Sequence, residues 1–194
     1  MVFPCPQGWQ AARRRFRVPH PHLDDRAPGR CRRTRGRSIL GHFSGAYLNG
    51  IDAKHRLSVP APIRETIEAR SQTRSVVLGP AEHAPCLVGY DVGYFDQLRA
   101  SMSERFAGDY GPGRSTTART LFAMSDVLKY EENGRVILSP ILLDLGGLKS
   151  QALFIGAGDY FELWAPETLL GEDGQDPRLI RMVRALMAQK GGAQ

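Results

Sequence analysis

The chain carries one pattern twice: residues 47–60 read YLNGIDAKHRLSVP, and residues 127–140 read VLKYEENGRVILSP. Each copy has an apolar-rich segment, a short polar segment, and then an arginine that opens a second apolar segment. Apolar segments on both sides of a polar turn are typical of a β-hairpin. The sequence therefore predicts two hairpins and, with them, an architecture built from two related halves.

The polar turns predict a particular backbone shape. In the second copy Asn133-Gly134 is a strong hairpin signal, because both residue types accept positive φ. In the first copy Lys54-His55 occupies the corresponding positions. Histidine is among the non-glycine residues enriched at positive φ. We therefore predict that the two turns have the same shape and that His55 takes the left-handed conformation.

An acidic residue stands four positions before each arginine, Asp52 before Arg56 and Glu131 before Arg135. A carboxylate can accept backbone N–H bonds in a turn and can hold a guanidinium in one orientation. An arginine held in this way loses less entropy when it meets a phosphate or a guanine, and a bidentate guanine contact is worth roughly 1–3 kcal/mol of discrimination. Lys54 is better suited to phosphate. We expect Arg56 to be the stronger candidate.

Two simpler interpretations of these residues stay open at this point. An acidic residue four positions before an arginine on a hairpin is more often a surface salt bridge than a binding site. Arg135 can also have a purely structural role, since no lysine accompanies it in the second loop. The duplication of the pattern favours a binding role over a surface salt bridge, with the second loop as the poorer candidate.

The positive charge of the chain is concentrated at its N-terminus. The formal net charge is +6, but residues 1–41 carry ten arginines against two aspartates. The rest of the chain has 16 basic and 18 acidic side chains. Residues 1–41 are also proline-rich and have no sustained apolar period, so we expect a disordered extension. A misassigned start site is one explanation for such an extension. An anionic partner of the remaining residues must therefore bind a local patch.

Outside the two motifs, the pattern predicts similar elements in each half. Spacing of three, four and four places Phe95, Leu98, Met102 and Phe106 on one face of a helix capped by Asp91. Asp176-Pro177 is expected to begin the last helix. The other expected elements are helices at 61–69, 115–123 and 141–145, and strands at 75–78, 86–90, 152–155 and 160–164.

Several functional classes find no support in the sequence. The three cysteines and five histidines lack the spacing of a metal site or a disulfide framework. Ser44 and Ser58 have no partners for nucleophilic catalysis, and Gly156-x-Gly158 lacks the rest of a dinucleotide loop. We expect no enzyme, no metal and no cofactor. The sequence contains no apolar run of transmembrane length, so we expect a cytoplasmic protein without a membrane partner.

The chain from Phe43 to about Gln189 resembles the MraZ family of bacterial transcriptional regulators. The match is carried by Phe43-Ser-Gly45, Ile51-Asp-Ala-Lys54, Arg56-Leu-Ser-Val-Pro60, Arg64, Asn133-Gly-Arg-Val136, Phe154-Ile-Gly156 and Glu162-Leu-Trp164. His55 departs from the family, which has glycine there, and Glu131 stands in place of an aspartate. Ser139 occupies the position of Pro60, with Pro140 one residue later.

The resemblance implies an α+β fold in which two SpoVT/AbrB-like repeats form a double-split β-barrel with flanking helices. The repeats are expected at 43–107 and 115–190, joined by a linker at 108–114. The resemblance further implies a ring homo-oligomer that binds short direct repeats in double-stranded DNA. Such proteins associate with the nucleoid and usually repress genes of cell division and cell-wall synthesis.

The resemblance also suggests which residues meet the DNA. The expected DNA-binding residues are Lys54, His55, Arg56, Asn133 and Arg135. Asp52, Glu131 and Gly134 are expected to orient the loops. The alternative is an AbrB-like antitoxin or another protein-interaction module, whose partner is a protein and whose DNA target, if any, lies elsewhere.

Overall fold

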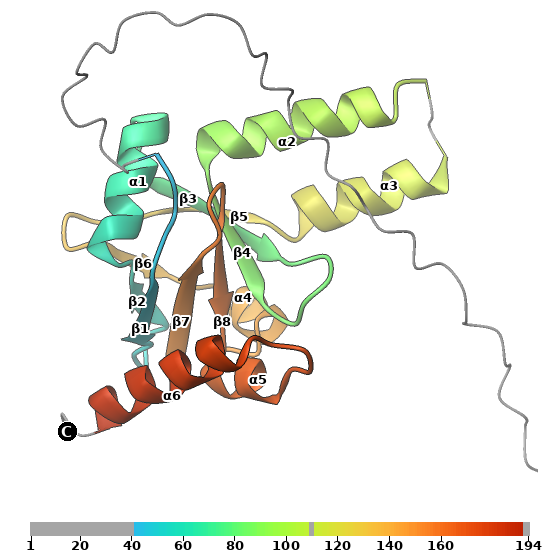
Figure 1. Cartoon of the computed structure of the whole chain (residues 1–194). Helices are drawn as coiled ribbons and strands as arrows, with labels where there is room; N and C mark the ends of the chain where they lie inside the picture. Colours follow the sequence, from blue (N-terminus) through green and yellow to red (C-terminus); the bar gives the residue numbers. More distant parts are fainter. Residues whose placement is uncertain (1–40, 109–110, 192–194) are drawn as a thin grey trace, which may run out of the picture. The chain divides into compact units, whose positions relative to one another are not determined.

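The computed structural model describes residues 41–108 and 111–191 (Figure 1). The expected extension at 1–41 therefore lies outside the described residues, except for Gly41. The strands are β1 (Ala46–Gly50), β2 (Arg56–Ser58), β3 (Ser75–Pro80), β4 (Leu87–Asp91), β5 (Asp126–Lys129), β6 (Arg135–Ile137), β7 (Gln151–Gly156) and β8 (Phe161–Trp164). The helices are α1 (Ala61–Ser71), α2 (Val92–Arg105), α3 (Pro112–Ala118), the π-helix η1 (Arg119–Ala123), α4 (Pro140–Leu145), α5 (Pro166–Gly171) and α6 (Pro177–Gly191). Within the described ranges no helix combines the length and apolar character needed to cross a bilayer.

The fold is a mixed α+β arrangement with two antiparallel sheets. Six strands form one sheet in the order β1-β7-β8-β4-β3-β5, and β2 and β6 form the other. The prediction that each motif is a two-stranded hairpin is wrong in one respect. The turns close as expected, but β1 pairs with β7 and β2 pairs with β6. The alternation of polar and apolar residues along a strand determines which side chains share a face. It does not determine which other strand becomes the neighbour.

Each half of the chain completes the sheet of the other half. β5 of the second half pairs with β3 of the first, as β1 of the first pairs with β7 of the second. The corresponding strands of the two halves are β1 and β5, β3 and β7, and β4 and β8. Exchanging them gives the same strand order, read from the opposite edge of the sheet. Two backbone bonds repeat this exchange at the turns: Val59 N–H donates to the Gly134 carbonyl at 2.8 Å, and Leu138 N–H donates to the His55 carbonyl at 3.0 Å. The two halves are therefore interleaved.

The apolar residues form two clusters on either side of the large sheet. The larger cluster lies beneath α1, α4 and the β2–β6 ribbon, and includes Leu57, Ile63 and Val136, each 1% exposed. The second cluster lies beneath α5 and α6 and includes Trp164 and Val183. Both ribbon strands therefore bury one face against the core, which leaves their opposite face toward solvent.

The helices largely follow the sequence pattern. Asp91 caps α2 by accepting the Tyr94 N–H at 3.1 Å, and Asp176 accepts the Arg178 N–H at 2.8 Å at the start of α6. α3 begins at Pro112, earlier than the expected Ser115 and inside the segment expected to be a linker. The short helix α5 was not anticipated, because its six residues are too few for a helical period to be recognised.

The apolar stripe of α2 faces inward, as its spacing predicts, but none of its residues is fully buried. Leu98, Met102 and Phe106 line a cavity of about 510 Å³ that is also bounded by η1 and β3–β4. The corresponding face of the other half is filled by Trp164 and Val183. Helix α2 therefore covers the strands of the first half less completely than α5 and α6 cover those of the second.

Candidate nucleic-acid interface

The first loop is closed by its backbone and then fixed by one carboxylate. His55 N–H donates to the Asp52 carbonyl at 2.9 Å, and His55 has φ of 59°, as predicted. The Asp52 carboxylate accepts the Lys54 N–H at 2.9 Å and the Arg56 N–H at 3.0 Å through Oδ1. Its Oδ2 accepts Arg56 Nε at 2.6 Å. One side chain thus holds both the turn and the guanidinium.

These bonds favour the ionised form of Asp52. The backbone bond from Arg56 has the largest effect, and the Arg56 side chain and the Lys54 N–H add to it. Together they lower the pKa of Asp52 to about 2. The carboxylate that orients Arg56 is therefore fully charged at neutral pH.

The second loop has the same backbone shape but a different side-chain arrangement. Gly134 N–H donates to the Glu131 carbonyl at 2.8 Å, and Gly134 has φ of 76°. Asn133 Oδ1 accepts the Arg135 N–H at 3.0 Å, and Asn133 Nδ2 donates to Glu131 at 3.2 Å. No ion pair joins Glu131 to Arg135 in the described part of the chain.

The expected equivalence of Asp52 and Glu131 is therefore not found in the geometry. Asn133 accepts the backbone N–H of the arginine, which is part of the task that Asp52 performs in the first loop. The Glu131 carboxylate, which is one methylene longer, instead accepts a bond from the Asn133 side chain. The signal for this role was present in the sequence, because asparagine side chains commonly bond the backbone two residues on.

Gly134 and His55 occupy equivalent positions with different surroundings. A Cβ atom on Gly134 would lie 2.6 Å from Arg64 Nε, and this nitrogen also donates to the Val59 carbonyl at 3.1 Å. Gly134 is accordingly buried, whereas His55 is exposed. The exposed first turn has space for a histidine side chain at the position of glycine. The left-handed backbone of His55 still carries a free-energy cost.

The β2–β6 ribbon brings the two arginines onto one surface. Its register sets Arg56 opposite Ile137 and Ser58 opposite Arg135, with Leu57 opposite Val136 between them. Opposite residues share a face. Leu57 and Val136 point into the core, so the other four side chains form the solvent face of the ribbon.

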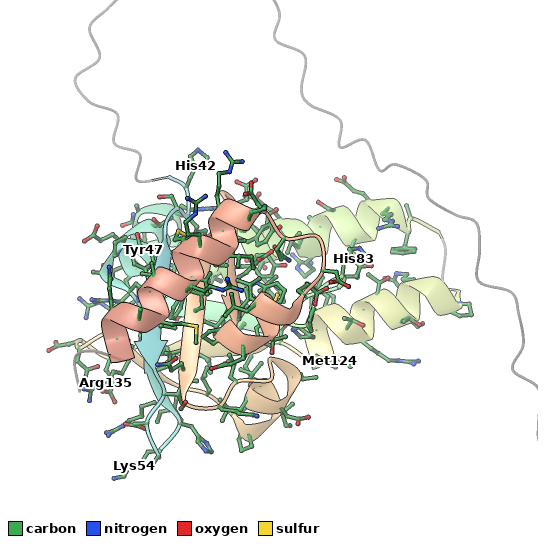
Figure 2. The ribbon with its side chains drawn as sticks, turned by 60° about the horizontal axis from the view of Figure 1, so that its bottom comes forward. His42, Tyr47, Lys54, His83, Met124 and Arg135 are labelled. Carbon is green, nitrogen blue, oxygen red and sulfur yellow. The ribbon has the colours of Figure 1, made fainter. Side chains whose placement is uncertain are left out.

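The two arginines are diagonal neighbours on this solvent face, which places their Cα atoms about 7–8 Å apart. The Arg56 side chain is 41% exposed, and Arg135 is exposed as well. Figure 2 shows Lys54 and Arg135 projecting at the end of the strands that lies opposite His42.

All five predicted DNA-binding residues lie on the two loops and the ribbon that joins them. The local hairpin pattern does not indicate the cross-repeat pairing that brings the loops together, although a double-split barrel is what the family resemblance implies. The sequence gives no sign of the contact of Arg64 with Gly134. Within 52–56 and 131–135 there are three basic and three acidic side chains, with histidine neutral. The two loops of one copy therefore present exposed cations, of which Arg56 is held by Asp52, without a net positive charge.

Comparison with known proteins identifies relatives over most of the chain. The chain is 30% identical over 143 residues to the transcriptional regulator MraZ of Rhodospirillum rubrum, and this match covers 73% of the chain and 90% of that protein. It is 32% identical over 130 residues to the transcriptional regulator MraZ of Gluconobacter oxydans, covering 66% and 78%. The identity to the protein of the same name from Rickettsia peacockii is 31% over 125 residues, covering 64% and 82%. No family model matches the chain.

Proposed function

Because the chain belongs to the MraZ family of transcriptional regulators, we propose that it binds operator DNA through the solvent face of the β2–β6 ribbon and its two flanking loops. The family consists of regulators and not enzymes. The finer proposal is a repressor of the cell-division and cell-wall gene cluster that acts in the cytoplasm at the nucleoid. Residues 43–107 and 115–190 would form the two AbrB-like repeats of a double-split barrel, which their interleaved pairing supports.

One observation carries the proposal: Arg56 is held by a charged Asp52 on the same exposed face as Arg135. A two-stranded ribbon fits the major groove, where an arginine can make a bidentate contact to guanine. Because Asp52 already fixes the guanidinium, less side-chain entropy is lost on binding. Lys54 and His55 lie at the tip of the first loop and are exposed, which suits them to phosphate contacts that set the register.

The balanced charge of the two loops in a single copy argues for an oligomer on a repeated site. Each copy offers few phosphate contacts, so one copy bound to one site should dissociate readily. We propose a ring that presents several ribbons to short direct repeats. Such an assembly gains affinity through effective concentration without any additional contact in each copy. Shortening an operator from several repeats to one should then abolish measurable binding.

The interaction-module alternative receives less support from the last helix. Antitoxins of the AbrB type commonly use a segment after the DNA-binding domain to bind the toxin. Here α6 packs on its own sheet, with Val183 fully buried beside Leu48 and Trp164. That helix is therefore already engaged in the core of the chain.

The proposal is tested by gel shift with the DNA that lies upstream of the gene for this chain. The wild type, Arg56→Ala and Arg135→Ala are compared at several salt concentrations. We expect Arg56→Ala to weaken binding and to relax sequence preference, by about 10-fold or more at each engaged site. Arg135→Ala should have a smaller effect. Unchanged affinity in both variants would exclude the ribbon face as the DNA-binding surface.

A further inference from the structure

One apolar side chain lies within the arginine-bearing face of the ribbon. Ile137 is 63% exposed and is the cross-strand partner of Arg56. Single exposed apolar residues are common on protein surfaces and need no function. Ile137 differs from the other large exposed apolar residues of the described chain because it alone lies on β2–β6, next to both arginines.

The internal repeat gives a direct comparison for this position. The equivalent residue of the first half is Ser58, which is the cross-strand partner of Arg135. The solvent face thus consists of two cross-strand pairs, Arg56 with Ile137 and Arg135 with Ser58. The arginines repeat between the halves, and their partners do not. The face is therefore polar at one pair and partly apolar at the other.

We propose that Ile137 contacts the 5-methyl group of a thymine adjacent to the guanine bound by Arg56. This inference rests on the proposed function, since it requires the ribbon to enter the major groove. The thymine methyl is the apolar group that this groove displays. Directly opposed side chains have Cβ atoms about 4.5–5.5 Å apart. The long arginine and the short isoleucine can therefore reach neighbouring base pairs.

The same difference gives the bound subunit a direction. With a serine in both positions, the two cross-strand pairs would be chemically alike, and only the flanking loops would distinguish the two ends of the ribbon. With Ile137 in one position, only one orientation places an apolar side chain against a thymine methyl. Direct repeats need every subunit to bind in the same orientation, and Ile137 supplies a preference for one.

The experiment compares two versions of the upstream DNA, one containing thymine and one made with deoxyuracil throughout. Deoxyuracil keeps the base pairing and lacks the methyl group. Binding of the full chain is followed by fluorescence anisotropy for the wild type, Ile137→Ser and Ile141→Ala. Ile141 is a matched control, because it is 68% exposed and lies on α4, outside the ribbon.

We expect the wild type to bind the deoxyuracil DNA at least about threefold more weakly, the effect of losing one buried methyl group. Ile137→Ser should bind both DNAs equally, and Ile141→Ala should keep the wild-type preference. Equal wild-type affinity for both DNAs would overturn the inference and leave the proposed function standing. Wild-type binding to neither DNA would overturn the proposed function and the inference with it.

Two further outcomes would also overturn the inference. If Ile137→Ser retained the wild-type preference for thymine, the methyl group would act through another residue or through DNA shape. If Ile137→Ser changed the mass of the oligomer in light scattering while Ile141→Ala did not, Ile137 would be a contact between copies of the chain. An unchanged melting temperature in both variants shows that the fold is intact.

Discussion

The two loops of this protein share a backbone and differ in how that backbone is held. In the first loop the Asp52 carboxylate bonds the turn and the guanidinium together. In the second loop Asn133 bonds the backbone of Arg135, and Arg64 closes over Gly134. The first loop thus fixes its arginine, and the second fixes mainly its turn. The two copies share the shape of the turn, and an ion pair that orients the arginine is found in the first copy.

The largest expected effect concerns the residue with positive φ in each turn. Gly134→His should lower the free energy of unfolding by about 2–5 kcal/mol, because a left-handed non-glycine residue costs about 1–2 kcal/mol and the contact with Arg64 adds about 1–3 kcal/mol of overpacking. His55→Gly should change it by less than about 1 kcal/mol, since relief of strain offsets the greater entropy of glycine in the unfolded chain. Urea denaturation at fixed protein concentration measures both.

The comparison of Gly134→His with His55→Gly tests whether space explains the difference between the loops. Each substitution gives one loop the residue of the other, so backbone shape alone would predict effects of similar size and opposite sign. Equal and opposite changes would show that Arg64 yields to the new side chain. A much larger loss for Gly134→His would support its tight contact with Arg64.

The second prediction separates the orientation of an arginine from its electrostatic surroundings. Asp52→Asn and Glu131→Gln each remove one negative charge near the DNA, which by itself should strengthen binding equally. Asp52→Asn also removes the ion pair that holds Arg56. We therefore expect Asp52→Asn to weaken DNA binding about two- to fivefold, the range of a surface ion pair. Glu131→Gln should strengthen it slightly, as measured by anisotropy.

The pair of variants serves as its own control, because the net charge of the chain changes equally in both. Equal strengthening of DNA binding by the two substitutions would mean that Asp52 does not orient Arg56 for DNA. Repeating the titration at higher salt should reduce the gain from Glu131→Gln, since salt screens exposed charges. The loss from Asp52→Asn should persist to a greater extent, because it reflects the geometry of Arg56.

Local sequence patterns predicted the turns better than the strand partners. The left-handed backbone of His55 follows from its place in a repeated turn, and the caps at Asp91 and Asp176 follow from residue type. The pairing of β2 with β6 joins residues that are far apart in the chain, and three-residue strands carry too little pattern to specify a partner. Duplication was the available signal, since β2 and β6 are equivalent strands of the two halves.

The side-chain arrangement of the second loop was harder to predict for a related reason. Asp52 and Glu131 carry the same charge at the same position, so pattern alone treats them as equivalent. Their difference depends on one methylene and on Asn133, which competes for the backbone of Arg135. Contacts such as that of Arg64 with Gly134 depend on the folded arrangement of several elements and leave no local pattern in the sequence.

The smallest expected effect is the pH dependence of the first loop. The bonds from Arg56 and Lys54 lower the pKa of Asp52 to about 2 in the folded chain, against about 3.9 for an unperturbed aspartate. The stabilising contribution of a carboxyl with a lowered pKa is complete above the unfolded value and is lost as pH falls through the folded one. The stability difference between the wild type and Asp52→Asn should therefore be constant above about pH 5 and shrink between about pH 4 and pH 2.

A carbon-detected NMR titration of the Asp52 carboxyl gives the direct measurement, read over the range in which the folded spectrum persists. In Arg56→Ala the side-chain bond is lost and the backbone bonds remain, so the midpoint should rise only part of the way toward its unperturbed value. If the Asp52 midpoint in Arg56→Ala returned fully to the unperturbed value, the guanidinium and not the turn would be what lowers the pKa of Asp52. A wild-type midpoint near 4 would remove the physical basis for treating the first loop as the better-held of the two.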